Sequence, residues 1–340
     1  MPIPFLLGAA AAVVVAGKGV LDHVEASDTN DTAQWIQKKA QELFDEEKEK
    51  LEAIQKKTEE SLLNLGNSKK NVLENSMSQF LRSYDRVKNI EFNKTDAINE
   101  ISNYVIDEQD AVEMQELTAN FISTFSSGVA GAATGSIIAL AATGSIGILT
   151  GGLTFAGTLV SVGMPGLALS MAGSTIAGAL AATPLAALAA PAVLFSGLAA
   201  KGKADENYDK AKEYEAEVEK AVEQMKTSST ICEAVSERAN MFADLLTKLN
   251  IMFADCSRRL DDMTAQKVID AKGRELNISD FDDNDIKLLA ITRALAGAVK
   301  SILDTPILSK EGNITDESEA KGKELKQGLP DFESAYSKIS

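Results

Sequence analysis

The chain has 340 residues, of which 25% are charged, and a formal net charge of −16. This acidic balance excludes simple electrostatic binding to nucleic acid or to anionic lipid, because no basic region stands out from it. All of the net charge comes from the two flanks, since residues 117–200 contain no Asp, Glu, Lys, Arg or His. About 20 apolar residues span a bilayer as a helix, so this uncharged block of 84 residues is long enough for more than one crossing.

The chain begins with an apolar segment, assigned here to residues 1–24. Residues 1–17 carry no charge, and the first charged residue, Lys18, follows them. This order is the reverse of a secretory signal, which begins with its basic residues. A short anchor, an interfacial segment and part of a buried core all stay open, and we favour membrane contact. We expect a cytoplasmic, membrane-associated protein without a secretory signal peptide.

A first amphipathic arm is predicted over residues 25–116. Within it, residues 32–89 predict one long helix with Asp31 and Gln34 as a capping pair. Gly66 and Asn67 mark the place where it is expected to kink or break. The apolar seam repeats at spacings of three and four, at Ile36, Ala40, Leu43, Leu51, Ile54, Leu62, Leu65, Val72, Phe80, Tyr84 and Val87.

The uncharged block, residues 117–200, is predicted to interact with a membrane. Glycines at spacing four let helix backbones approach closely, as in helix association in lipid. Gly-Gly, Pro-Gly and Thr-Pro pairs predict breaks between the pieces 117–150, 153–164, 167–183 and 185–200. The first piece is long enough to span, and two crossings are expected if both arms lie on one side. The residues predicted to pack helices or contact lipid are Gly131, Gly135, Gly147, Gly151, Gly152, Phe155, Pro165, Pro184 and Phe195.

A second amphipathic arm is predicted over residues 201–264, with one helix from residue 203 to about 264. Because an apolar insert separates two long amphipathic helices, the arms are expected to pack as an antiparallel pair. The seam of this arm includes Tyr208, Ala211, Val218, Val222, Met225, Val235, Phe242, Leu245, Leu249, Met252, Cys256 and Leu260.

The C-terminal region, residues 265–340, predicts a third helix from about Asp283 to Leu303 and a polar tail with a weak last helix. The acidic cluster at 280–285 resembles a calcium loop but lacks its central Gly and closing Glu, so acidic N-capping is favoured. Period-two alternation is absent throughout. The predicted fold is all-α: an elongated antiparallel helical bundle or coiled coil with a long uncharged apolar helical-hairpin insert.

Residues that could support catalysis or ligand binding are scarce. His23 is the single histidine, and Gly17-Lys18-Gly19 lacks the spacing of a phosphate-binding loop. Cys232 and Cys256 match no metal or redox spacing and are expected to be buried thiols. We therefore expect no enzyme activity, no catalytic or cofactor-binding residues, and neither a metal nor another cofactor.

The organisation of residues 32–264, two amphipathic arms around an apolar insert, resembles the α-helical pore-forming toxins of the cytolysin A and haemolysin BL type. That resemblance implies an insert that is hidden in the soluble form and refolds to enter a membrane. The opening Met1-Pro2-Ile3-Pro4-Phe5-Leu6-Leu7-Gly8 and the segment Asp304-Thr305-Pro306-Ile307-Leu308 are also similar to an uncharacterised bacterial family loosely labelled chemotaxis-like.

Two functions follow from these features. The first is a membrane-inserting helical protein, a pore-former or membrane-permeabilising effector, that hides its apolar hairpin until triggered. The alternative is a constitutively membrane-anchored coiled-coil scaffold or adaptor without pore activity. A soluble bundle with a buried hairpin is a third reading. The expected partners are a lipid membrane and, through the arms, a second copy or another helical protein, with no nucleic acid.

Overall fold

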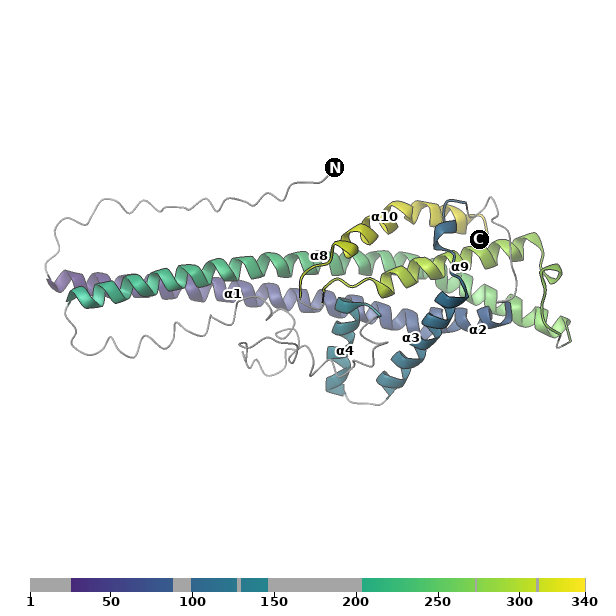
Figure 1. Cartoon of the computed structure of the whole chain (residues 1–340), viewed down its shortest axis with the longest axis horizontal. Helices are drawn as coiled ribbons and strands as arrows, with labels where there is room; N and C mark the ends of the chain where they lie inside the picture. The colour runs from purple at the N-terminus through teal and green to yellow at the C-terminus, as the bar shows by residue number, and fades with distance from the viewer. Residues whose placement is uncertain are drawn as a thin grey trace. The chain divides into compact units, whose positions relative to one another are not determined.

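The structure, a computed structural model, is all-helical in the residues that it describes. Those residues are 26–87, 99–126, 130–145, 204–272, 274–309 and 312–339. Within these ranges the one β-type pairing is an isolated bridge between Leu308 and Ile314, so the prediction of an all-α fold is confirmed. The elements (Figure 1) are α1 (Ala26–Val72), the π-helical turn η1 (Leu73–Met77), α2 (Ser78–Val87), η2 (Ser102–Tyr104), α3 (Glu108–Ser126), α4 (Ala130–Thr143), α8 (Ala204–Asp270), η5 (Ile278–Asp280), α9 (Asp283–Asp304) and α10 (Asp316–Ser337).

The chain divides into two compact units, and α1 and α8 contribute residues to both. The described part of the small unit is residues 26–46 and 204–222. The large unit contains the remaining described residues, from Glu47 onward in the first half of the chain and from Glu223 onward in the second.

The small unit is a two-helix seam. Ala33 and Ile36 of α1 pack with Ala211 of α8 in one buried cluster. Ala40 packs with Tyr214 in the next, where the Tyr214 hydroxyl donates a hydrogen bond of 2.8 Å to the side-chain oxygen of Gln41. The predicted seams are confirmed here apart from Leu43, which is 39% exposed.

In the large unit, α1 and α8 run parallel. The Thr58 hydroxyl donates to the backbone oxygen of Cys232 at 2.9 Å, and further along the Ser76 hydroxyl donates to Asn250 at 2.7 Å. Residue numbers therefore rise together along the two helices. The predicted antiparallel direction is wrong, because it assumed that the insert makes a simple turn. Two arms around an insert can pack in either direction, because a long crossover connection can return a chain to the end from which it started.

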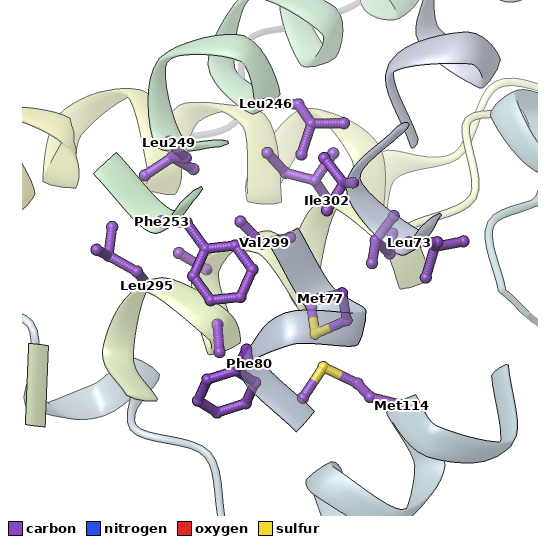
Figure 2. Packing of buried hydrophobic residues seen from close by; sticks show 14 of the residues in the cluster. Leu73, Met77, Phe80, Met114, Leu246, Leu249, Phe253, Leu295, Val299 and Ile302 are labelled. Carbon is purple, nitrogen blue, oxygen red and sulfur yellow. The ribbon is translucent and has the colours of Figure 1, made fainter. Parts of the chain in front are cut away.

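The core of the large unit forms around α9. Leu295 and Val299 of α9 pack near Phe253 of α8, and Phe253 lies beside Phe80 of α2 with 5.6 Å between ring centroids (Figure 2). At Gly297 an added Cβ would lie 1.8 Å from the backbone oxygen of Tyr104, so only glycine allows η2 to approach α9 this closely. The burial of α9 on several faces explains its long apolar sequence.

Helix α9 begins with an acidic cap, as the sequence predicted. The Asp282 carboxylate accepts hydrogen bonds from the backbone N–H groups of Asn284, at 2.8 Å, and Asp285, at 2.9 Å. The Asp285 carboxylate in turn accepts from the backbone N–H of Asp282, which completes a capping box. The predicted third helix is confirmed almost to the residue.

The last helix, α10, is longer than the weak helix that the polar tail predicted. It follows a turn in which Gly312 has a positive φ of 82°, and the Thr315 side chain caps its first turn. Arg238 donates to the backbone oxygen of Ser318 at 3.4 Å, and Tyr336 donates to Asp255 at 3.2 Å. Helix α10 therefore lies along α8 in a parallel direction, which a polar sequence with Pro330 inside the helix did not reveal.

Candidate functional site

The structure describes the first part of the uncharged block, up to residue 145. The predicted first piece, 117–150, contains the end of α3 at Ser126 and a separate helix α4 that begins at Ala130. Among the helices in the described ranges, none combines the length and the apolar character that a membrane crossing requires. Gly131 and Gly135 lie in α4, whereas the other predicted block residues lie outside the described ranges: Gly147, Gly151, Gly152, Phe155, Pro165, Pro184 and Phe195.

Helix α4 crosses α1 at Gly66. A Cβ added to Gly66 would lie 2.2 Å from the backbone oxygen of Ile137, so the two backbones are in direct contact there. The predicted break at Gly66 is wrong, because α1 continues through it to Val72 and the irregular turn comes later, at Leu73–Met77. The glycine serves the approach of another helix rather than a kink.

The C-terminal end of α4 is tied to the segment that follows α9. Ile307 and Leu308 both donate their backbone N–H groups to the oxygen of Ala142, each at 2.8 Å. Gly144 ends the helix with a φ of 65°, and an added Cβ there would lie 2.2 Å from the backbone oxygen of Asp304. The end of α4 is thus fixed by backbone contacts that another residue at position 144 would disturb.

Lys69 of α1 lies next to the last turns of α4 and α9 and is fully buried. Its Nζ donates hydrogen bonds of 3.2 Å to the backbone oxygens of Leu140, in the last turn of α4, and Leu303, in the last turn of α9. Both oxygens belong to helix ends, where carbonyls have no partner within the helix and the helix dipole is negative. One side chain therefore caps the C-termini of two helices.

Burial lowers the pKa of Lys69 to about 7 from an ordinary value of 10.5, and the carboxylate of Asp304 offsets part of that shift. A buried ammonium without an adjacent carboxylate loses its hydration, which favours the neutral amine. Near neutral pH the side chain therefore exists in both protonation states.

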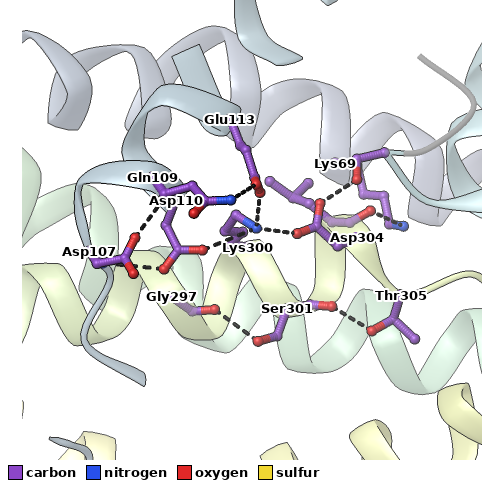
Figure 3. A network of polar contacts seen from close by, with 12 residues as sticks. Lys69, Asp107, Gln109, Asp110, Glu113, Gly297, Lys300, Ser301, Asp304 and Thr305 are labelled. Atoms are coloured by element: carbon purple, nitrogen blue, oxygen red, sulfur yellow. Dashed lines mark hydrogen bonds and ion pairs between the residues drawn. The ribbon is translucent and has the colours of Figure 1, made fainter. Parts of the chain in front are cut away.

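A second lysine, Lys300, gathers carboxylates beside this junction (Figure 3). Its Nζ lies 2.8 Å from Asp304, 3.0 Å from Glu113 and 3.3 Å from Asp110. Burial by itself lowers the pKa of Lys300, but these carboxylates outweigh it and raise the pKa above its usual value. The Ser145 hydroxyl also donates to Asp304, so the residue after the glycine turn joins the network. Lys300 of α9 thus contacts α3 through Asp110 and Glu113, and it is linked to the end of α4 through Asp304.

Lys69 is not among the residues that the sequence patterns singled out, although a signal for it exists. It follows Leu65 by four residues and precedes Val72 by three, so it occupies a position of the apolar seam. A lysine at a seam position is expected to be either a snorkelling side chain or a buried one with specific partners. Its partners are backbone oxygens, which no side-chain motif reveals.

Within the described residues, no group of His, Cys, Asp and Glu side chains is arranged to hold a metal ion. Cys232 and Cys256 are buried free thiols, and burial raises their pKa values to about 11 and about 12. His23 lies outside the described ranges. The arrangement at Lys69 is therefore suited to holding helices together.

Comparisons of the chain with protein-family models, with curated proteins and with solved structures return no match.

Proposed function

We propose that this chain is a membrane-inserting α-helical protein whose uncharged block enters a lipid bilayer when it is released from the helices around it. Insertion of the block would permeabilise the membrane or form a pore. The observation that carries the proposal is the contact of Lys69 with the last turns of α4 and α9. Together with the hydrogen bonds from Ile307 and Leu308 to Ala142, it holds α4, a described helix of the block, against the other helices of the large unit.

The composition of the block supports this proposal. Residues 117–200 offer water no charged group, so the block is stable only when it is covered by protein or by lipid. In the described part, residues 138–142 of α4 are buried by the large unit. The same residues could enter hydrocarbon without exposing unpaired backbone groups, because the N–H and C=O groups of a helix form hydrogen bonds with each other.

The spacing of glycines in α4 supports association of helices in lipid. Gly131 and Gly135 lie one turn apart and present a small-residue row. Such rows let helices approach closely enough for van der Waals contact, which drives association where the hydrophobic effect between helices is absent. The row therefore fits a block that self-associates after insertion.

Leakage of a trapped dye from liposomes tests the proposal. The full chain, purified without detergent, is added to vesicles of neutral and of anionic lipid, and both dye release and flotation with the vesicles are measured. We expect flotation together with leakage. Flotation without leakage would overturn the permeabilising function and favour the anchored scaffold, whereas a chain that stays with neither vesicle would overturn membrane insertion itself.

A matched pair of variants sharpens this test. Replacing Gly131 and Gly135 together by leucine fills the small-residue row, and we expect flotation to persist while leakage falls. Replacing Ala132 and Ser136 by leucine adds similar bulk one residue further along the helix and serves as the control. Equal leakage from both pairs would show that the glycine row has no role in permeabilisation.

A further inference from the structure

The chemistry of Lys69 goes beyond simple attachment of α4. We propose that Lys69 is a proton-controlled latch: the neutral amine holds α4 in the large unit, and protonation of the amine favours release of α4. The consequence of release, insertion into lipid, rests on the proposed function above, but the latch itself is a property of the protein without lipid.

The number of donors matches the neutral form. A neutral amine has two N–H donors, and Lys69 donates to two backbone oxygens, those of Leu140 and Leu303. Protonation adds a third donor and a full charge to a fully buried site. Asp304, the carboxylate that acts on this charge, is already bound by Lys300 and Ser145. The two helix ends and Asp304 favour a positive charge, but the loss of hydration on burial outweighs them, so the charged form is the less well accommodated one.

Other charged side chains lie near Lys69 or are linked to its surroundings through Lys300. On α9 these are Asp304 and Lys300, on α3 they are Asp110 and Glu113, and α4 has no charged residue. The pKa of Lys300 is raised, and hydrogen bonding to Lys300 lowers the pKa of Glu113. On α1 the neighbouring residue Lys70 forms an ion pair with Glu74, about one helical turn further along. The pKa values of Lys300 and Glu113 thus move away from the neutral range, whereas that of Lys69 moves toward it.

The direction of the pH effect follows from the two states of α4. With α4 docked, the pKa of Lys69 is about 7, and with α4 released and the side chain hydrated it returns toward 10.5. Between these values the released state binds more protons, so docking weakens as the pH falls from 10.5 to 7. Below pH 7 both states are protonated, and this contribution becomes constant.

Hydrogen–deuterium exchange of the amides of residues 137–143, without lipid, tests the latch. Exchange is measured at pH 7.5 and 9.5, corrected for the intrinsic rates, and compared with amides of the α8 core around Phe242. We expect the opening of α4 to increase on the order of tens of fold at the lower pH, as proton linkage requires, with a much smaller change in α8. Equal corrected exchange at the two pH values would overturn the latch.

Two substitutions identify the residue responsible. Lys69→Met removes the titrating amine at similar volume, and we expect the pH dependence of residues 137–143 to disappear. Lys70→Met, the matched control, removes the neighbouring lysine and should leave it intact. A response to pH that survives in a folded Lys69→Met variant would overturn the assignment.

A direct titration keeps the test independent of any variant that fails to fold. The side-chain carbon signal of Lys69 in the full chain, labelled at lysine and followed by NMR, should change with a midpoint near 7. A midpoint above about 10, the ordinary value for lysine, would overturn the latch. Leakage without a pH response at residues 137–143 would remove the latch alone, and a pH response without leakage would remove the proposed function alone.

Discussion

Helices α4 and α9 are both rich in alanine, yet the large unit holds them in different ways. Helix α9 has buried side chains along most of its length, an acidic capping box at its start and Lys300 near its end. Helix α4 has no charged residue. Its described contacts are the crossing at Gly66, the hydrogen bonds of its last turn and the burial of four side chains between residues 138 and 142. Both C-termini end at the same buried lysine, Lys69.

This difference separates an element that builds the core from one that is attached to it. Removing α9 would expose the side chains of α2, α8 and α10 that pack around it. Separating α4 would uncover Ile138, Leu140, Ala141 and Ala142, and would break one close crossing and a few hydrogen bonds to backbone oxygens. Among the described side chains, α4 therefore adds fewer residues to the core than α9 does.

Two buried leucines provide the largest expected contrast. Leu295 of α9 and Leu140 of α4 are 0% and 1% exposed. We expect Leu295→Ala to lower the free energy of unfolding of the large unit by about 2–5 kcal/mol, as cavity-forming substitutions do. Leu140→Ala should instead raise exchange at residues 137–143 and leave global unfolding nearly unchanged.

Urea unfolding followed by circular dichroism, together with hydrogen exchange, measures both effects. Ile251→Ala serves as the surface control, since Ile251 is 67% exposed, and should change stability by less than about 0.5 kcal/mol. If Leu140→Ala lowered global stability as much as Leu295→Ala, α4 would be part of the core and the contrast would be wrong.

Two glycines give the next effect in size. A Cβ at Gly66 would meet the backbone oxygen of Ile137 at 2.2 Å, whereas a Cβ at Gly322 would meet the flexible end of Met241 at 2.0 Å. Because backbone yields less easily than a methionine side chain, we expect Gly66→Ala to weaken the docking of α4 by about 1–3 kcal/mol.

Exchange at residues 137–143 reports the docking of α4, and Gly322→Ala is the matched control with a similar clash on α10. We expect the control to leave that exchange unchanged. If Gly66→Ala left exchange at residues 137–143 unchanged, α1 and α4 could move apart here at no cost in free energy. The close crossing at Gly66 would then not hold α4.

Much of the bundle was predictable from spacing, because burial in amphipathic helices repeats every three or four residues. Nearly every predicted seam residue of α8 is buried, and the acidic cap of α9 was identified from its composition. The parallel direction of α1 and α8 was not predictable in this way, because a seam has the same spacing in either direction. Direction depends instead on the path of residues 88–203.

The candidate site was harder to predict for a different reason. Its hydrogen-bond acceptors are the backbone oxygens of Leu140, Ala142 and Leu303, and every residue has such an oxygen. Sequence patterns identify side chains, so they indicated an apolar block but not where its first helix ends or what binds it. The glycine at position 66 was visible as a signal, and its role depended on a helix distant in sequence.

The cap of α9 gives the smallest expected effect and tests whether α9 is held by its ends as α4 is. Hydrogen bonds from the backbone amides of Asp285 and Asn284 lower the pKa of Asp282 below 3.8. Its contribution to stability is therefore present above about pH 4 and is lost as the pH falls through the lowered value. We expect Asp282→Ala to reduce the melting temperature at pH 7 by roughly 1–3 °C. Asp282→Asn keeps an acceptor at every pH and should lose less stability on acidification than the wild type. A larger loss from Asp282→Ala than from Leu295→Ala would mean that α9, too, depends on its ends more than on its buried faces.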